Sequence, residues 1–153
     1  MNKEICKFMD KALIQAQKAL EKGEVPIGAI IVDSNGVIIA RAHNKVETLG
    51  SQAAHAEVLA IQKACKKLGD WRLAGCTIYV TLEPCLMCLG LIQISRIAGL
   101  VYGAKSTLFG ASLSDVSKLP TYAKTLIIQG GIKEQESLKL LKSFFKNLRK
   151  KNH

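Results

Sequence analysis

Aromatic residues are scarce in this chain. They make up 5% of it (one Trp, three Tyr and four Phe), although 48% of the 153 residues are hydrophobic. Aliphatic side chains must therefore fill most of the core. Proline is rare as well, with three residues, and no linker, low-complexity segment or repeat separates two domains. Because the length suits one core of ordinary size, the sequence predicts a single domain over residues 1–153.

Long apolar runs are also missing. Charged residues, from Lys3 and Glu4 to Lys18, interrupt the N-terminal segment, unlike the apolar stretch of a secretory signal peptide. No segment reaches the roughly 20 apolar residues of a membrane-spanning helix. We therefore expect a cytoplasmic protein with no membrane partner.

The cysteines do not form the pattern of a disulfide framework. There are five of them, at irregular spacing, whereas small secreted domains carry an even number. Cys65 lies on an apolar helical stripe and Cys76 opens a strand-like run, so both are expected to be small core residues. Free thiols of this kind suit a reducing compartment.

Acidic residues are outnumbered by basic ones. Lys and Arg total 22 against 12 for Asp and Glu, which gives a formal charge of +10. Such an excess favours a polyanionic partner, and nucleic acid before a membrane surface. A basic protein without any such partner remains the plainer interpretation of charge alone.

Hydrophobic periodicity predicts helices that alternate with strands. Asn35-Gly36 is a strong hairpin signal, and Pro84 is expected to begin a helix, where proline is best tolerated. Helices are predicted over residues 2–22, 55–68, 84–95 and around 138–148, strands over 27–32, 37–42, 77–81, 97–102 and 125–129, and a long loop over 103–121. This alternation predicts an α/β fold, a three-layer α/β/α sandwich around a central mixed sheet of about five strands.

Two short motifs supply metal ligands. They are His55-Ala56-Glu57 and Pro84-Cys85-Leu86-Met87-Cys88. Cys85 and Cys88 are three residues apart in the first turn of a predicted helix and so share one face, while His55 lies where another helix starts. Three protein ligands leave one tetrahedral position open for water, as in catalytic zinc sites. We therefore expect one Zn²⁺ per subunit at this set.

A Cys-x-x-Cys pair by itself also occurs as a redox pair or as half of a structural zinc site. A structural zinc needs a fourth ligand, and the only other histidines are His43, at the end of a predicted strand, and His153, at the chain terminus. A redox-active cysteine pair does not require a His-x-Glu motif elsewhere in the chain. The complete pattern is the signature of zinc-dependent nucleobase deaminases and favours a catalytic site.

Glu57 is the predicted catalytic residue. A Glu in the first turn of a helix by default complements the helix dipole at the surface. Beside a zinc-activated water it becomes a general acid/base instead. Deamination requires a proton to leave the water, to reach a ring nitrogen and then to reach the departing amine. One carboxylate can serve all of these transfers.

Longer stretches carry a more specific resemblance. They are residues 24–29, Asn44, residues 54–57, 79–88, 95–97 and 102–104, and Phe144-Phe145 with the basic residues that follow. Over residues 12–150 the chain resembles the bacterial tRNA-specific adenosine deaminases, of the cytidine/deoxycytidylate deaminase superfamily. The resemblance implies a cytidine deaminase-like fold and the hydrolysis of adenosine to inosine at the wobble position of a tRNA anticodon, by zinc-activated hydroxide.

The resemblance also assigns roles to residues. His55, Cys85 and Cys88 would bind zinc, and Glu57 would carry protons. Asn44 would hydrogen-bond the flipped base, because an amide offers both a donor and an acceptor. The residues implied in substrate binding are Asn44, Val25, Ile27, Ala56, Phe145 and Lys105. The implied partners are a tRNA anticodon stem-loop and a second copy of the chain in a homodimer, with no organic cofactor.

Other interpretations stay open at this point. A guanine deaminase, or another deaminase of free bases or nucleosides, would use the same fold and zinc chemistry. A zinc-stabilised RNA-binding module without catalysis would explain the charge and the cysteines but not the position of Glu57. Asn44 alone reads equally well as a turn residue, and Phe144 and Phe145 as core residues. Ser106, after Lys105, departs from the usual pattern of the family, as does the loop over residues 105–117.

Overall fold

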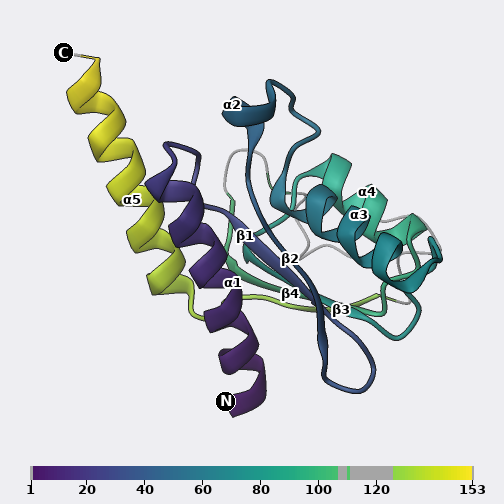
Figure 1. Ribbon diagram of the computed structural model, residues 1–153. Coiled ribbons are helices and arrows are strands. Elements are labelled where there is room, and N and C mark those ends of the chain that lie inside the picture. The colour runs from purple at the N-terminus through teal and green to yellow at the C-terminus, as the bar shows by residue number, and fades with distance from the viewer. Residues whose placement is uncertain (1, 107–109, 111–125, 153) are drawn as a thin grey trace.

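The computed structural model describes residues 2–106, 110 and 126–152. Helices and strands follow one another along the chain as the sequence predicts (Figure 1). The helices are α1 (Lys3–Glu21), α2 (Val46–Leu49), α3 (Ala56–Leu68), α4 (Leu86–Ile94) and α5 (Glu134–Lys151). The strands are β1 (Gly28–Val32), β2 (Ile38–His43), β3 (Thr77–Leu82), β4 (Gly99–Ala104) and β5 (Ile127–Gln129).

The five strands form one mixed sheet in the order β2-β1-β3-β4-β5. β1 pairs antiparallel with β2 and β3, whereas β3–β4 and β4–β5 are parallel. Helices α1 and α5 cover one face of this sheet and α3 and α4 cover the other (Figure 1). The predicted three-layer α/β/α sandwich with five mixed strands is therefore confirmed.

Each face of the sheet has its own hydrophobic core. Ile31 and its neighbours pack against α3 and α4, while the adjacent Ile30 packs with Met9 of α1, as expected where alternate strand residues point to opposite faces. Close contact of α1 with the sheet depends on Gly28, since a Cβ there would overlap the Ala12 carbonyl oxygen. These contacts fix the segment before β1, which borders the site described below.

Several local predictions were wrong. α4 starts at Leu86 rather than at Pro84, and Cys85 is its N-cap. β4 covers Gly99–Ala104, two residues later than expected, and the single turn of α2 was not predicted. Most of the predicted loop over 103–121 lies outside the described residues.

The apolar face of α5 is less covered than its periodicity predicts. Ser137, near its start, is buried against Gly103 of β4. The later turns extend past the sheet (Figure 1), and there Phe145 is 45% exposed and Leu148 is 41% exposed. Helical spacing predicts that these residues share one side of α5, and in the described structure that side is only partly covered.

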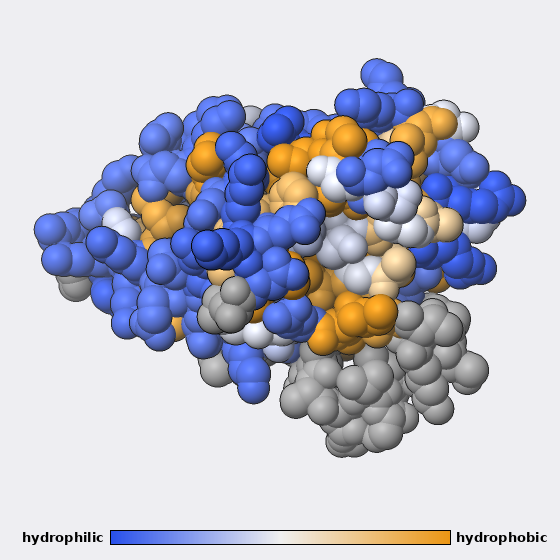
Figure 2. Space-filling model, turned by 90° about the horizontal axis from the view of Figure 1, so that it is seen from below, coloured by the Kyte–Doolittle hydropathy of each residue, from blue (hydrophilic) through white to orange (hydrophobic). Residues whose placement is uncertain are grey.

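No helix among the described residues combines the length and the apolar character needed to cross a membrane. Hydrophilic residues cover much of the face shown in Figure 2, where they are interrupted by patches of hydrophobic side chains.

Candidate active site

The three predicted metal ligands lie together. Nδ1 of His55, Sγ of Cys85 and Sγ of Cys88 all lie within 4.8 Å of one another. The Nδ1 atom is 3.4 Å from the Cys88 sulfur and 3.7 Å from the Cys85 sulfur. His55 is the N-cap of α3 and Cys85 is the N-cap of α4. Two helix N-termini on the same face of the sheet thus bring together residues 30 positions apart.

The donor atoms fit a zinc ion. Zinc–sulfur bonds of ~2.3 Å and zinc–nitrogen bonds of ~2.0–2.1 Å at a tetrahedral angle place nitrogen and sulfur about 3.6 Å apart. The two observed separations, 3.4 and 3.7 Å, bracket that value. Cys88 is fully buried, and burial, followed by the charges of Glu57 and Cys85, raises the pKa of its thiol. A thiolate at this position therefore requires a cation beside it.

His55 is prepared to act as a ligand. Burial lowers the pKa of its imidazole, so the ring is neutral near pH 7. The other ring nitrogen, Nε2, lies 3.4 Å from Oε1 of Gln52. A proton on Nε2 that points to this oxygen leaves Nδ1 with a free lone pair facing the thiols, the common pattern for metal-bound histidines.

Glu57 lies in the first turn of α3, two residues after His55, and is only 5% exposed. Burial raises the pKa of its carboxyl group, while hydrogen bonds from its own backbone and from Cys88 act in the opposite direction. The side chain therefore differs from the exposed, dipole-complementing Glu that its position would otherwise suggest. A buried carboxyl group next to three metal donors can take up and release a proton at the site.

A cleft of about 900 Å³ opens beside this cluster. It lies at the end of the sheet where β3 and β4 terminate, the edge at which open α/β sheets bind ligands. Because β1 and β2 run antiparallel, the segment before β1 and the segment after β2 reach the same edge. The cleft is lined by Val25, Ile27, Asn44, Val46, Glu47, Gln52, His55, Glu57, Leu82, Glu83, Cys85, Met87, Lys105, Ser106, Leu141 and Phe145.

This cleft brings together most of the predicted site residues, including Asn44, Lys105 and Phe145, from three separate parts of the chain. Ala56 is fully buried and its side chain is not part of the lining; the expected contribution of its backbone amide stays a prediction. Cys88 is buried behind the cleft wall. Val46 and Glu47 also line the cleft but carry no signal in the sequence, because the short helix α2 to which they belong has no hydrophobic periodicity.

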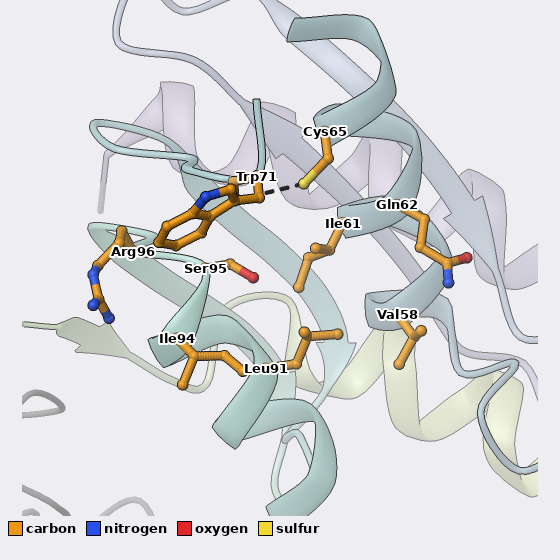
Figure 3. Close-up of a pocket in the computed structure, with 9 residues that line it drawn as sticks. All are labelled: Val58, Ile61, Gln62, Cys65, Trp71, Leu91, Ile94, Ser95 and Arg96. Atoms are coloured by element: carbon orange, nitrogen blue, oxygen red, sulfur yellow. Dashed lines mark hydrogen bonds between the residues drawn. The ribbon is translucent and has the colours of Figure 1, made fainter. Parts of the chain in front are cut away.

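A second hollow, of about 820 Å³, lies between the outer sides of α3 and α4 (Figure 3). Leu91 and Ile94 reach it from α4, and Val58 and Ile61 from α3. The ring of Trp71 closes one end next to Arg96, and the Cys65 thiol lies 3.7 Å from the Trp71 carbonyl oxygen. None of its nine described lining residues is acidic or a histidine, and the Cys65 thiol is the single metal-ligand type among them.

Comparison with known proteins identifies the chain. Residues 2–104 match the cytidine and deoxycytidylate deaminase zinc-binding region. A tRNA-specific adenosine deaminase of Bacillus subtilis (strain 168) is 48% identical, over 94% of this chain and 90% of the relative.

Solved structures agree with this match. One, from a study of A-to-I editing by tRNA A34 deaminases at the wobble position of transfer RNA, is 42% identical with a TM-score of 0.82, covering 88% of this chain and 99% of that one. A guanine deaminase from Bacillus subtilis is 39% identical with a TM-score of 0.66, covering 78% and 79%. The chain therefore belongs to the zinc-binding cytidine and deoxycytidylate deaminase family and, within it, to the tRNA-specific adenosine deaminases.

Proposed function

We propose that this protein hydrolyses adenosine to inosine at the wobble position of a tRNA anticodon loop and releases ammonia. The observation that carries the proposal is the position of Glu57, buried beside a three-donor zinc site in a cleft that Asn44, Lys105 and Phe145 also line. The membership of the chain in the family of tRNA-specific adenosine deaminases supports the same conclusion.

His55, Cys85 and Cys88 would hold one zinc ion per subunit. When bound, zinc supplies a Lewis acid that makes water nucleophilic near neutral pH. Glu57 takes a proton from the attacking water and delivers it to N1 of the adenine ring as C6 becomes tetrahedral. Its carboxyl group then carries the remaining proton of that water, now on the C6 oxygen, to the amine, so that the C6–N bond breaks, ammonia departs and inosine remains.

The residues around the cleft would position the base. Asn44 offers one end of its amide to the purine edge, while Val25 and Ile27 form the apolar wall. The backbone amide of Ala56, at the start of α3, would help to hold the base or the reacting oxygen. The target base must leave the stack to reach this depth, which costs least in a hairpin loop.

Phe145 and Lys105 would bind the rest of the loop. Phe145 is half-exposed on the cleft rim and packs edge-on against Phe144 at 5.3 Å between ring centroids, so a rigid aromatic surface faces the cleft. Exposed aromatic rings of this kind stack unpaired bases. Basic residues follow Phe145 on α5, namely Lys146, Arg149, Lys150 and Lys151, and would contact phosphates.

The decisive experiment is product analysis with zinc-loaded protein. One sample contains an anticodon stem-loop with adenosine at the wobble position, and parallel samples contain free guanine or cytosine. Inosine at the wobble position, with the free bases unchanged, is the expected result. Ammonia from guanine with unchanged RNA would instead establish a free-base deaminase, and RNA binding without any product would establish a binding module.

We further propose that two copies of the chain associate through the outer side of α4. Six of the nine residues of α4 have large apolar side chains, all but Cys88, Gly90 and Gln93, and a helix that is apolar on all sides is expected to be covered on all sides. Yet Leu86 is 73% exposed and Ile94 is 52% exposed, and Ile94 borders the hollow between α3 and α4 (Figure 3). Exposed apolar surface of this kind marks protein–protein interfaces.

Light scattering after size-exclusion chromatography tests this association. The wild type is expected to elute as a dimer and Ile94→Glu as a monomer. Ile14→Glu, at an equally exposed position of α1, is the matched control and is expected to remain dimeric. A monomeric wild type would contradict the proposal. We also propose a cytoplasmic location, in keeping with the odd number and irregular spacing of the five cysteines, which do not suit a disulfide framework.

A further inference from the structure

Glu24 is a buried carboxylate to which the proposed chemistry assigns no role. It is 1% exposed and lies in the turn between α1 and β1. Its Oε1 accepts a hydrogen bond from the backbone N–H of Glu47 at 2.9 Å. Its Oε2 accepts two more from Thr48, from the backbone N–H at 2.7 Å and from the hydroxyl at 2.6 Å.

Through these hydrogen bonds a residue from a distant part of the chain caps the N-terminus of α2. The N-cap of α2 is Lys45, which forms no side-chain capping hydrogen bond to any described residue. A four-residue helix is too short to be stable by itself, and its first N–H groups need acceptors. Glu24, more than 20 positions earlier, supplies them for the N–H groups of Glu47 and Thr48. The carboxylate therefore holds α2 in place directly after Asn44.

Asn44 is tied to the same network. Its Nδ2 donates to the Val25 carbonyl oxygen at 3.3 Å, and its Oδ1 accepts from the Val46 N–H at 3.4 Å. One partner is the residue next to Glu24 and the other is the first residue of α2. The two bonds fix which end of the amide carries the oxygen, and leave one N–H and one lone pair for a ligand.

We propose that Glu24 is a positioning residue for substrate recognition: by holding α2 it fixes the orientation of the Asn44 amide that meets the purine edge. This inference rests on the proposed deaminase function. Asn44, Val25, Val46 and Glu47 all line the cleft, so the network that orients the amide lies at the cleft wall itself.

The ionisation of Glu24 agrees with this role. Burial raises the pKa of the carboxyl group, but the hydrogen bonds from Thr48 and Glu47, together with the nearby His43, outweigh burial and bring the pKa below its ordinary value. The carboxylate is therefore charged at neutral pH and accepts all three hydrogen bonds.

A double-mutant cycle separates positioning from a general structural role. The four proteins are the wild type, Glu24→Gln, Asn44→Ala and the double variant, with Glu21→Gln as the control for loss of an exposed charge nearby. Each is tested for zinc content, melting temperature and single-turnover conversion of the stem-loop with a wobble adenosine.

We expect Glu24→Gln to lower kcat/KM by about tenfold, as for the loss of a hydrogen bond to a charged group, with zinc content unchanged and less than a twofold effect of Glu21→Gln. In the Asn44→Ala background Glu24→Gln is expected to have less than a twofold effect. If Glu24→Gln does not fold, Thr48→Val, which removes only the hydroxyl donor, is put through the same cycle.

Equal losses in both backgrounds, or a lower melting temperature with unchanged kcat/KM, would overturn the inference. A wild type that forms inosine while Glu24→Gln behaves like Glu21→Gln refutes this inference alone. A wild type that forms no inosine refutes the proposed function, and this inference with it.

Discussion

Replacing Glu57 by Gln removes the proposed proton carrier and almost nothing else. The two side chains have nearly the same volume, so the buried position in the first turn of α3 stays filled. Two other carboxylates line the cleft, but neither is available as a substitute. Glu83 is buried and accepts the Ser106 N–H at 3.1 Å, and Glu47 belongs to the exposed side of α2.

The expected loss of rate in Glu57→Gln follows from the lack of a second carboxylate that could replace Glu57. General acid/base catalysis by one group contributes about 10²–10⁴ in rate. Because Glu57 serves successive transfers and has no neighbour to replace it, we expect Glu57→Gln to lose about 10³–10⁴ in kcat, equivalent to about 4–5.5 kcal/mol of activation free energy. Zinc content and RNA affinity should stay within twofold of the wild type, since the three donors and the cleft rim are untouched.

Single-turnover conversion of the stem-loop, metal analysis and an RNA binding assay on the same preparations test this expectation. Glu21→Gln, an exposed carboxylate at the end of α1, serves as the control for charge. The reasoning is refuted if Glu57→Gln keeps more than a tenth of the wild-type rate. A loss of zinc in proportion to the loss of activity would equally contradict it, because Glu57 would then be supporting the metal.

Four further predictions concern the metal, RNA binding, packing and the pH dependence of stability. Cys88→Ser should abolish stoichiometric zinc binding in metal analysis and lower the melting temperature, because the fully buried thiol is one of the three donors that the described residues bring together; unchanged zinc content would show a wrong ligand set. Phe145→Ala should weaken stem-loop binding by about 5–150-fold, because one stacked base contributes about 1–3 kcal/mol. The affinity of the wild type for the stem-loop should fall steeply as salt concentration rises. An affinity that does not change with salt would contradict the proposed contacts between basic residues and phosphates. Gly28→Val should destabilise the fold by about 1–3 kcal/mol or more in urea unfolding, because its side chain would overlap the Ala12 carbonyl oxygen. The stabilising effect of Glu24 should depend on pH: its pKa is lowered in the folded state, so the stability lost in Glu24→Gln is present above the ordinary Glu pKa and disappears as pH falls through the folded value. Equal destabilisation at pH 3 and pH 7 would contradict that sign.

The sequence predicted the parts of the site that depend on local spacing. The i, i+3 spacing of Cys85 and Cys88 and the His-x-Glu motif both lie at helix starts, where the neighbouring residues determine the geometry. The prediction that Pro84 begins the helix was wrong because Cys85 takes the N-cap position. A helix start two residues later still leaves both thiols on the same side of α4, so the predicted ligand set does not depend on where the helix begins.

Other features depend on contacts between distant segments and were not predictable in this way. Helix α2 has no apolar period, and the acceptor of its Glu47 and Thr48 N–H groups, Glu24, lies more than 20 residues away. Periodicity placed Phe145 and Leu148 on one face of α5 but could not tell whether another element covers that face. Their exposure is decided by how far α5 extends past the sheet (Figure 1).

The residues proposed for catalysis and those proposed for RNA recognition are held in place by different parts of the structure. The metal donors and Glu57 lie at the starts of α3 and α4, which pack on the sheet through a core of fully buried side chains such as Ile92 and Ala60. The rim depends on a four-residue helix held by one carboxylate and on the exposed end of α5. Substitutions in the rim therefore disturb few core contacts, whereas substitutions at the donors alter the metal site itself. Changes of substrate should consequently arise through α2, α5 and the residues that hold them, with the zinc chemistry left intact.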